Sequence, residues 1–479
     1  MSMQIETLLR NVAVKRAIGY RNLDVLSVVA DSRKAEKGSL FVCLSGGKAD
    51  GCDYVLDAEK RGAIAIVAER ETETDLPQFI VEDSRIALAL ISGNFYGNPA
   101  EKLSLITVVG TNGKTSTVEI LSEIMTFAGR KCATVGTLGY KVDGKRLEGT
   151  LTTPDPLELH KKLAEMAESG VEYVFLEASA HAIHYRKLAG IRAKASVFTN
   201  ITRDHLDFFE SMERYAAVKL SYFKHENTGL AVVNSDDPYG RILLRSQAVP
   251  TVSYGIDNPA DVFAINLFEG EEGLAFTINA FDRIEEIKTP LFGRFNVYNV
   301  MAATATAMYL GVSLSTVSRA LRNMRRVPGR YEVRYIKGRR VIVDYAHTPD
   351  GLENLLSDLR RNGEGRILTV FGCGGDRDRG KRPMMGRVAS EYSDITIVTD
   401  DNPRNEEERA IADEILCGVV EERGVEVVLD RRQAIKRAFE LSREGDRIVI
   451  AGKGHERTME IKGEKIPYSD YEVLQELDR

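Results

Sequence analysis

A glycine-rich segment with a lysine and several hydroxyl side chains occupies residues 109–116, with the sequence VGTNGKTS. It follows an apolar run and precedes a stretch with the periodicity of an amphipathic helix. Backbone N–H groups in such a loop bind an anion, the lysine supplies charge to phosphates, and a hydroxyl can hold Mg²⁺. The segment therefore predicts an ATP site made by Gly110, Thr111, Asn112, Gly113, Lys114, Thr115 and Ser116.

Two other interpretations of this loop are less favoured. An ordinary glycine turn is disfavoured because Gly-Lys-Thr stands between an apolar strand and a helix. GTPase switches and motor ATPases are disfavoured because Gly110 and Gly113 are closer together than the glycines of the common P-loop pattern.

Two further polar side chains follow predicted strands. Glu177 comes after the apolar run 173–176, and His205 follows the run SVFTNI. Carboxyl ends of parallel strands are where an open α/β sheet assembles its site, and phosphoryl transfer needs metal ions in oxygen-rich surroundings. Both residues are therefore candidate magnesium ligands. Taken singly, a surface carboxylate and a buried structural imidazole explain them equally well.

These residues need sheets to position them, and the apolar runs predict an α/β fold of three domains. The chain of 479 residues is too long for one compact core. Residues 1–100 are predicted to form a small α/β domain, and residues 101–327 a central P-loop ATPase domain with a parallel sheet. Residues 261–292 are predicted to add an antiparallel hairpin or flap to it. Residues 328–479 are predicted to form a doubly wound, Rossmann-like domain.

Composition restricts the class of protein. Apolar residues make up 43% and charged residues 28%, which disfavours disordered, collagen-like and membrane classes. The net charge of −6 indicates small-molecule substrates and no nucleic-acid partner. The five cysteines lack a CxxC pair, which argues against a disulfide framework or a zinc site. Without a leader sequence or an apolar run of about 20 residues, we expect a cytoplasmic protein with no membrane insertion. We also expect a monomer.

Several uncommon strings recur in a fixed order, namely GTNGKTS, LEASAHA, TNITRDHLD, GRFNVYN, VPGRYE and DYAHTPDG. This series resembles the Mur ligase superfamily, and the likeness covers almost the whole chain. It implies that a substrate carboxylate takes the γ-phosphate of ATP, that an amine attacks the acyl phosphate, and that phosphate leaves. The role of the protein is then mainly positioning and charge stabilisation.

The resemblance also implies roles around the nucleotide. These are Lys114 at the phosphates, Thr115, Glu177 and His205 at Mg²⁺, and Asn296, Arg330 and Asp344 completing the ATP site. Arg330 and Asp344 come from the linker and the last domain. That domain must therefore close over the central one, which also keeps water from the acyl phosphate.

Lys219 matches the lysine that this family carries as a carbamate, N6-carboxylysine. A lysine ammonium, with a reference pKa of about 10.4, repels Mg²⁺, whereas its carbamate presents two anionic oxygens. By residue type alone, a solvated helix lysine is the simpler interpretation. With the resemblance, Lys219 joins Lys114, Glu177 and His205 as an implied catalytic residue and becomes a metal ligand.

The N-terminal domain is similar to the UDP-binding domain of the members that add the third amino acid, through ADSR, GSLFV and GKADG. By residue type alone, Asp-Ser-Arg is a turn with a capping serine. In two departures, Ala180 stands where a second serine is usual, and Lys187 where an arginine is typical. Lysine and arginine bind anions differently, so Lys187 and the neighbouring Arg186 are both candidates. The implied UDP-substrate residues are Ser32, Lys48, Thr152, Thr153, Ser179, Arg186 and Lys187.

The choice of amino acid rests on DNPR at residues 401–404, which matches the diaminopimelate-adding members. Diaminopimelate has one carboxylate more than lysine, and an arginine guanidinium can bind that carboxylate through two parallel hydrogen bonds. A helix-entry turn is the alternative interpretation. The implied diaminopimelate-binding residues are Arg377, Asp401, Asn402, Pro403, Arg404, Gly452 and Glu456.

Together these likenesses imply addition of meso-diaminopimelate to UDP-N-acetylmuramoyl-L-alanyl-D-glutamate, with ATP and Mg²⁺ as cofactors. A lysine-adding or folylpolyglutamate-type ligase and a non-catalytic nucleotide-binding scaffold remain as alternatives. His181 and His184 have the spacing of a metal pair, but no third ligand accompanies them, so we predict a structural role.

Overall fold

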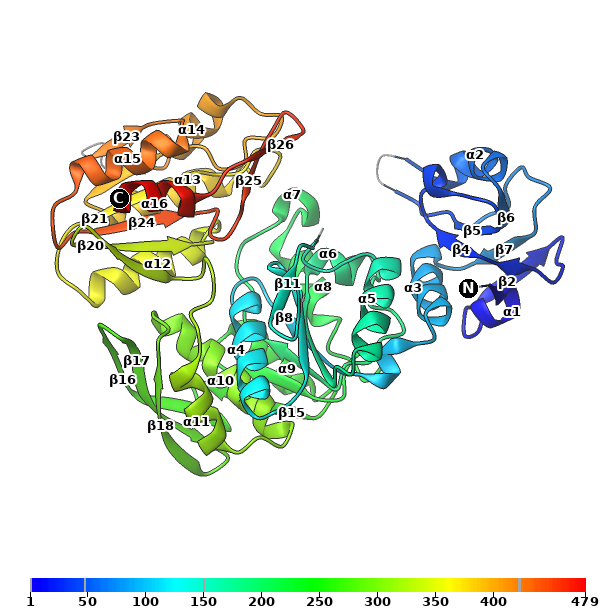
Figure 1. The fold of residues 1–479 in the computed structure, drawn as a ribbon, viewed down its shortest axis with the longest axis horizontal. Coiled ribbons are helices and arrows are strands. Elements are labelled where there is room, and N and C mark those ends of the chain that lie inside the picture. Colours follow the sequence, from blue (N-terminus) through cyan, green and yellow to red (C-terminus); the bar gives the residue numbers. More distant parts are fainter. Residues whose placement is uncertain (1, 47–48, 150, 421–423) are drawn as a thin grey trace.

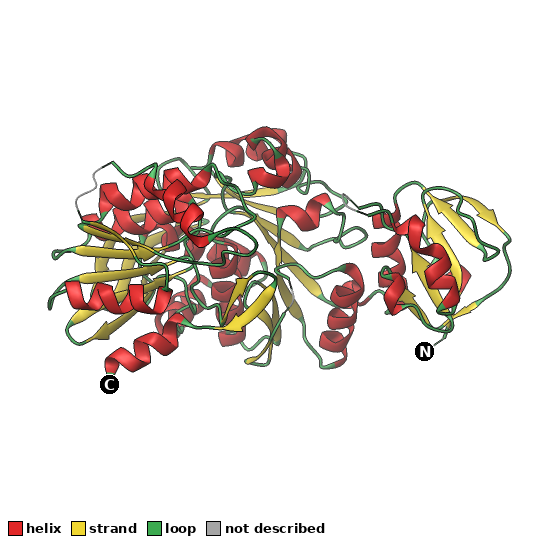
Figure 2. Cartoon of the chain, turned by 90° about the horizontal axis from the view of Figure 1, so that it is seen from above, coloured by secondary structure: helices red, strands yellow, loops and turns green. Residues whose placement is uncertain are grey.

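The computed structural model describes residues 2–46, 49–149, 151–420 and 424–479. Three α/β units follow one another along the chain, each with its own sheet (Figure 1). The N-terminal unit stands at one end, whereas the central and C-terminal units lie against each other (Figure 2). The predicted α/β class is therefore confirmed. Within the described ranges, no helix is long and apolar enough to cross a membrane.

The N-terminal unit is a five-stranded sheet in the order β2-β7-β6-β5-β4, parallel except at β2. Its inner strands are apolar on both faces, as expected where a parallel sheet is covered on both sides. The strands are β1 (Met3–Gln4), β2 (Val14–Ile18), β3 (Asp24–Val25), β4 (Ser27–Val29), β5 (Ser39–Val42), β6 (Ala63–Ala68) and β7 (Gln78–Val81). The helices are α1 (Ile5–Leu8), α2 (Val55–Lys60) and α3 (Ser84–Phe95), with 3₁₀ turns η1 (Ser32–Lys34), η2 (Gly51–Tyr54) and η3 (Pro99–Lys102).

The central unit is an eleven-stranded sheet in the order β11-β10-β9-β12-β8-β13-β14-β15-β16-β17-β18. Its strands are β8 (Ser104–Val109), β9 (Cys132–Gly136), β10 (Gly139–Val142), β11 (Lys145–Leu147), β12 (Tyr173–Ala178), β13 (Ala195–Phe198), β14 (Ala231–Asn234), β15 (Thr251–Gly255), β16 (Val262–Gly270), β17 (Gly273–Ala280) and β18 (Arg283–Thr289). Its helices are α4 (Lys114–Phe127), α5 (Pro156–Glu168), α6 (Ala180–His184), α7 (Leu206–Phe209), α8 (Met212–Leu220), α9 (Pro238–Ser246), α10 (Arg294–Tyr309) and α11 (Leu314–Asn323).

Strand β8 lies in the middle of this sheet and is buried on both faces. Ile106 and Val108 belong to the apolar core beneath α4 and α10, while Leu105 and Val109 belong to the core beneath α5 and α8. Residues 261–292 form three antiparallel strands that continue the same sheet. The predicted antiparallel pairing there is confirmed, although the segment is larger than one hairpin.

The C-terminal unit is a six-stranded sheet in the order β19-β20-β24-β21-β22-β23, parallel except at β19. Its strands are β19 (Glu332–Ile336), β20 (Arg339–Asp344), β21 (Ile367–Phe371), β22 (Ile395–Val398), β23 (Val425–Val427), β24 (Arg447–Ala451), β25 (Thr458–Ile461) and β26 (Glu464–Pro467). Its helices are α12 (Pro349–Arg361), α13 (Lys381–Tyr392), α14 (Glu408–Leu416), α15 (Arg431–Leu441) and α16 (Asp470–Asp478).

The sheet topology decides where polar side chains gather. Loops after β8, β12 and β13 leave the carboxyl edge of the central sheet, and loops after β20, β21, β22 and β24 leave the carboxyl edge of the C-terminal sheet. Residues from both sets of loops line the same cavities, so the two edges face each other.

Candidate active site

Two cavities lie between the central and C-terminal units and meet at the glycine-rich loop. The larger has a volume of about 490 Å³ and the smaller about 280 Å³. Both are lined by Asn112, Gly113, Arg330 and Tyr345. A molecule in the larger cavity can therefore reach the smaller one through the loop.

The loop is shaped by close packing around its glycines. Gly113 has φ of +84°, and a Cβ there would lie 2.5 Å from Oδ1 of Asn299. A Cβ at Gly110 would lie 1.8 Å from the Thr199 hydroxyl. Lys114 opens helix α4, and its Nζ donates to the carbonyl oxygens of Gly110 at 3.0 Å and Thr111 at 2.8 Å. Burial lowers the pKa of Lys114, despite the attraction of nearby carboxylates.

Oxygen and nitrogen atoms of the types that bind metals gather beside the loop. Thr115, Glu177 and His205 all line the smaller cavity. The buried Glu177 carboxylate accepts hydrogen bonds from the backbone N–H of Thr137 at 2.8 Å and from its hydroxyl at 3.1 Å. Burial lowers the pKa of His205 to about 3, so its ring is neutral and able to bind a metal.

This donor set fits Mg²⁺ held jointly with phosphate. Over the described ranges, no group of three or more His, Cys, Asp or Glu side chains could hold a metal ion by itself. Mg²⁺ usually binds through one or two carboxylates together with substrate phosphates and water. The Glu177 carboxylate and the Thr115 hydroxyl, next to the glycine-rich loop, match this mode of Mg²⁺ binding.

Lys219 lies outside both cavities, beneath the loop. Its side chain is 1% exposed, and its Nζ donates to the Thr111 hydroxyl at 3.0 Å and to the Tyr215 hydroxyl. Burial and the nearby Lys114 ammonium lower its pKa well below the usual lysine value. The interpretation of Lys219 as a solvated helix lysine is therefore wrong.

Arg330 brings the C-terminal part of the chain to the glycine-rich loop, and Asp344 brings it to the larger cavity. Nη2 of Arg330 donates to the Thr115 hydroxyl at 2.9 Å. Asp344 ends β20 and lines the larger cavity, and burial raises the pKa of its carboxyl. Asn296 is buried outside both cavity walls and donates to the Phe292 carbonyl. Its helix neighbour Asn299 lines the larger cavity instead.

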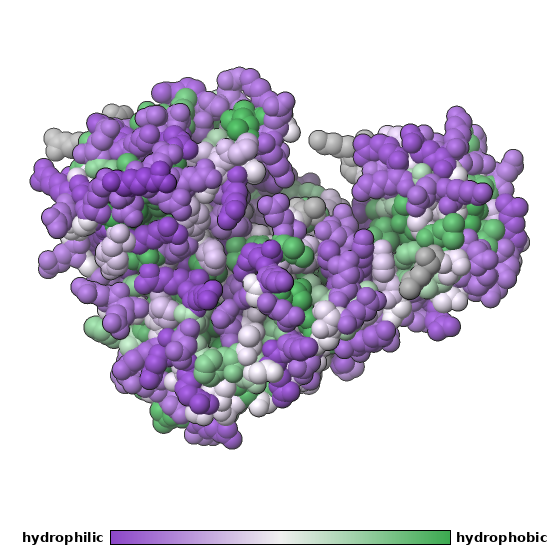
Figure 3. Space-filling model, viewed as in Figure 1, coloured by the Kyte–Doolittle hydropathy of each residue, from purple (hydrophilic) through white to green (hydrophobic). Residues whose placement is uncertain are grey.

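The residues predicted to bind the UDP substrate are spread over two units. Thr152 and Ser179 line the smaller cavity, and Thr153 lies behind them with its hydroxyl donating to the Glu177 carbonyl at 2.7 Å. Ser32 lies in the N-terminal unit. A hollow opens between this unit and the C-terminal one (Figure 3).

The two basic candidates for this substrate differ in their surroundings. Lys187 pairs with Asp155 at 2.7 Å, whereas Arg186 is exposed and has φ of +56°. The prediction for Lys48 lies outside the described residues.

The C-terminal unit supplies one wall of the smaller cavity. Six of the seven predicted diaminopimelate residues line it, namely Arg377, Asp401, Asn402, Arg404, Gly452 and Glu456, whereas Pro403 does not. Nε of Arg404 donates to Glu460 at 3.0 Å. Lys453, which is fully buried, donates to Glu456 at 2.9 Å and to Asn402 at 3.1 Å. These bonds hold the wall in a defined geometry.

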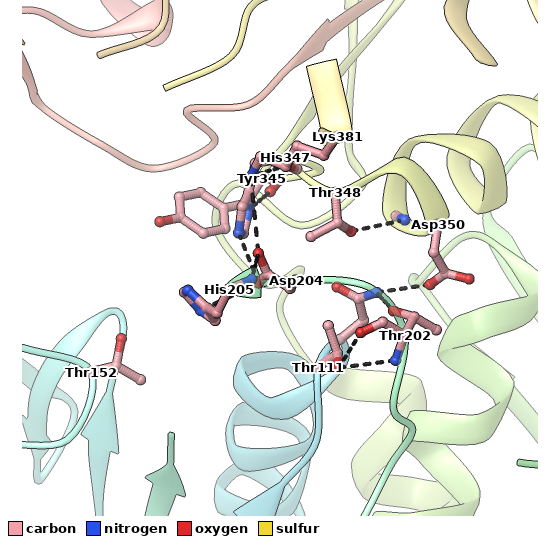
Figure 4. Close-up of polar contacts among 12 residues, drawn as sticks. Thr111, Thr152, Thr202, Asp204, His205, Tyr345, His347, Thr348, Asp350 and Lys381 are labelled. Carbon is pink, nitrogen blue, oxygen red and sulfur yellow. Dashed lines mark hydrogen bonds and ion pairs between the residues drawn. The ribbon is translucent and has the colours of Figure 1, made fainter. Parts of the chain in front are cut away.

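Sequence reasoning missed several residues of the smaller cavity. Asp204, His347 and Lys381 line it, and Figure 4 shows the latter two above Asp204 and His205. The Asp204 carboxylate lies 3.9 Å from Nε2 of His347 and 4.0 Å from Nζ of Lys381. Burial acts to raise the pKa of the Asp204 carboxyl, but electrostatic interactions with His205, His347 and Lys381 outweigh it and lower this pKa. The polar strings after the predicted strands, TRDH and DYAH, were the available signal.

His181 and His184, the two histidines predicted to be structural, pack against aromatic rings. The His181 ring lies 4.6 Å from the Phe208 ring and 4.8 Å from the His205 ring, and His184 lies 5.2 Å from Phe208. Such contacts suit the predicted structural role.

Comparisons with known proteins agree with this arrangement. Three family models match in order: "Mur ligase family, catalytic domain" at residues 25–102, "Mur ligase middle domain" at 108–307, and "Mur ligase, glutamate ligase domain" at 329–454. The UDP-N-acetylmuramoyl-L-alanyl-D-glutamate–2,6-diaminopimelate ligase of Syntrophomonas wolfei is 40% identical over 485 residues, covering 100% of this chain and 99% of the relative.

Solved structures give the same result. That of a UDP-N-acetylmuramoyl-L-alanyl-D-glutamate–2,6-diaminopimelate ligase has a TM-score of 0.71 at 29% identity, covering 100% of this chain and 99% of that one. The MurF ligase of Thermotoga maritima in complex with ADP shares the fold, with a TM-score of 0.63 at 23% identity over 89% of this chain and 93% of that one. This chain belongs to the Mur ligase family.

Proposed function

We propose that this chain is an ATP-dependent ligase that joins meso-diaminopimelate to the D-glutamate of UDP-N-acetylmuramoyl-L-alanyl-D-glutamate. The observation that carries the proposal is the meeting of two cavities at one phosphate loop. ATP occupies the larger cavity, and its γ-phosphate reaches the smaller one at Gly113 and Arg330. Both the carboxylate to be activated and the attacking amine bind in the smaller cavity.

The residues around the loop stabilise the transferring phosphoryl group. Lys114 and Arg330 bring positive charge to developing negative charge, in a buried place where such interactions are strong. Thr115, Glu177 and His205 would hold Mg²⁺, which neutralises phosphate charge when bound. The glutamate carboxylate of the substrate attacks the γ-phosphorus, ADP leaves, and an acyl phosphate remains.

The C-terminal wall then presents the amine. Asp401 and Glu456 are carboxylates suited to ammonium groups, while Arg377 and Arg404 suit the extra carboxylate of diaminopimelate. The amine nitrogen attacks the acyl carbon, phosphate leaves, and the amide forms. Because the two walls belong to units that face each other across the cavity, water has little access to the acyl phosphate.

Lys219 is proposed to carry a carbamate. Burial next to Lys114 favours the neutral amine, which is the form that adds to CO₂. The carbamate brings negative charge beneath the phosphate loop, and the Thr111 and Tyr215 hydroxyls are in place to donate to it. Its anionic oxygens extend the metal site towards the loop.

The substrate at the other end of the smaller cavity is proposed to reach the N-terminal unit. Thr152 and Ser179 contact its peptide part, and Ser32 its uridine nucleotide. ATP and a nucleotide-linked sugar as substrates favour reaction in the cytoplasm by a monomer, since one chain carries every proposed site residue.

A panel of amines tests the proposal. With ATP, Mg²⁺ and the UDP-dipeptide present, we expect phosphate release and an amide product of the correct mass with meso-diaminopimelate, and far less with lysine. Turnover with lysine alone would assign the lysine-adding reaction instead. ATP binding without any amide product would support a nucleotide-binding scaffold.

A further inference from the structure

Arg203 and Asp378 form an ion pair across the junction of the central and C-terminal units. The guanidinium donates from Nε to Oδ2 at 3.1 Å and from Nη2 to Oδ1 at 3.2 Å, a two-pronged geometry. The two residues are 175 positions apart in sequence. The pair therefore exists only while the two units lie together.

Each partner is a sequence neighbour of proposed site residues. Arg203 directly precedes Asp204 and His205 on the loop after β13. Asp378 directly follows Arg377 on the loop between β21 and α13. The pair thus links the loop that carries the proposed metal ligand His205 to the loop that carries Arg377, which is proposed to bind diaminopimelate.

The surroundings of Asp378 hold this pair in one geometry. Its Oδ1 also accepts a hydrogen bond from the backbone N–H of Gly380 at 2.9 Å, which orients the carboxylate. A Cβ at Gly380 would lie 2.5 Å from Nη2 of Arg203, so a side chain there would push the guanidinium away. The carboxylate side chain is 8% exposed, which limits screening by solvent.

A second set of charges crosses the same junction next to the pair. Nζ of Lys381 lies 4.0 Å from the Asp204 carboxylate and donates to the His347 carbonyl at 2.9 Å (Figure 4). The adjacent residues Arg203 and Asp204 therefore each lie next to a side chain of opposite charge from the C-terminal unit.

We propose that Arg203 and Asp378 are a positioning pair that aligns the amine-binding wall with the phosphate loop. Neither residue is among the described ones that line the cavities, so the pair acts through Arg377 and His205. The proposal rests on the ligase function proposed above. Displacement of one wall by about 1 Å can slow a bimolecular step roughly 100-fold, so a modest contact can matter for rate.

Kinetics of charge-neutral variants test the pair. Arg203→Gln and Asp378→Asn each remove one charge, and the double variant removes both; Asn keeps the size of Asp, whereas Gln is shorter than Arg. We expect each to raise the KM for diaminopimelate about tenfold and to lower kcat, with little change in the KM of the UDP-dipeptide. The double variant is expected to match the single ones, because each removes the same interaction.

Arg437→Gln is the matched control. Arg437 makes a two-pronged pair with Glu426, and these side chains are 40% and 36% exposed, but both belong to the C-terminal unit. This variant is expected to leave all kinetic constants unchanged. Unchanged diaminopimelate KM in the Arg203 and Asp378 variants, or effects that add in the double variant, would overturn the proposal.

Small-angle X-ray scattering separates this proposal from the ligase function. With ADP and the UDP-dipeptide bound, we expect Asp378→Asn to have a larger radius of gyration than the unmodified protein. If the protein makes no amide with any amine, the proposed function fails, while the scattering difference still supports coupling between the units. Equal radii for the two proteins would overturn the positioning role.

Discussion

Replacing Gly113 by alanine tests whether the phosphate loop depends on its contact with helix α10. The new Cβ would lie 2.5 Å from Oδ1 of Asn299, a buried side chain. Gly113 also has φ of +84°, where alanine is strained by about 1–2 kcal/mol. The variant therefore suffers both backbone strain and a collision.

The size of the collision follows from the bonds that it disturbs. Oδ1 of Asn299 accepts a hydrogen bond from Thr117 at 3.3 Å, and its Nδ2 donates to Asn296 at 2.8 Å. Moving this side chain weakens both bonds, at about 0.5–1.5 kcal/mol each. We therefore expect a loss of about 1–3 kcal/mol in the free energy of unfolding beyond the backbone strain.

Gly129→Ala supplies the control for strain alone. Gly129 follows the other end of α4 with φ of +78°, and a Cβ there would meet nothing within 4 Å. Urea denaturation of the two variants, followed by ADP titration calorimetry, separates the two effects. We expect the Gly113 variant to unfold at lower urea and to bind ADP more weakly, while the Gly129 variant keeps its ADP affinity.

The contact with Asn299 can be tested directly in the same assays. Adding Asn299→Ala to Gly113→Ala removes the colliding oxygen, so the double variant should be less destabilised than the sum of the two single variants. Equal losses for Gly113→Ala and Gly129→Ala, or strict additivity in the double variant, would refute this reasoning.

Three other outcomes are expected. Arg404→Lys keeps the charge but loses the two-pronged fork, so the KM for diaminopimelate should rise by roughly 10- to 100-fold with the ATP KM unchanged, as steady-state kinetics would show. Lys219→Ala should abolish ligation yet bind ADP, and recovery of activity by added acetate or another short acid would fit a missing carboxylate; undiminished ligation would contradict the carbamate. His160 is buried, neither of its ring nitrogens has a hydrogen-bond partner within the described ranges, and burial lowers its pKa from 6.5 to about 4. Because the unfolded chain binds this proton at higher pH, the stability contribution of the neutral ring is full above pH 6.5 and is lost as pH falls towards 4. His160→Phe should flatten the loss of stability in that window by up to roughly 3 kcal/mol, and an identical pH profile would contradict this.

The parts of the fold that depend on local sequence were predictable. The run from Ser104 to Val109 is apolar at every position but its first and fourth, as a strand covered on both faces requires, and the loop after it carries its own glycine and lysine signals. The antiparallel character of residues 261–292 also followed from strand signals separated by glycine and acidic turns.

Helix phase explains why Asn299, and not Asn296, lines the larger cavity. Helix α10 begins at Arg294, so both Asn296 and Asn299 lie within its first two turns. Asn296 bonds back to the Phe292 carbonyl, whereas Asn299 reaches the phosphate loop. A sequence shows two asparagines three residues apart, but only the start of the helix and its tilt decide which one faces the cavity. The ATP contact of Asn296 stays a prediction.

Contacts between segments that are far apart in the sequence were not predictable from local sequence. Arg203 and Asp378 are ordinary charged residues in their own segments, and nothing in either segment identifies the other as a partner. Lys453 follows a buried strand, where a fully buried ammonium is expected only with partners. Of those partners, Glu456 is three residues away in the same loop, whereas Asn402 comes from the loop after β22.

The use of two facing sheet edges has a chemical reason. The carboxyl edge of a single open sheet forms a crevice that remains open to solvent on one side. Such a crevice suffices to bind a nucleotide, but an acyl phosphate formed there would meet water as readily as an amine. A second sheet edge facing the first covers that side, and under the proposed function it brings the amine on the covering surface itself. Exclusion of water and delivery of the nucleophile then become one motion, and residues such as Arg330 and Asp378, which link the units, influence both.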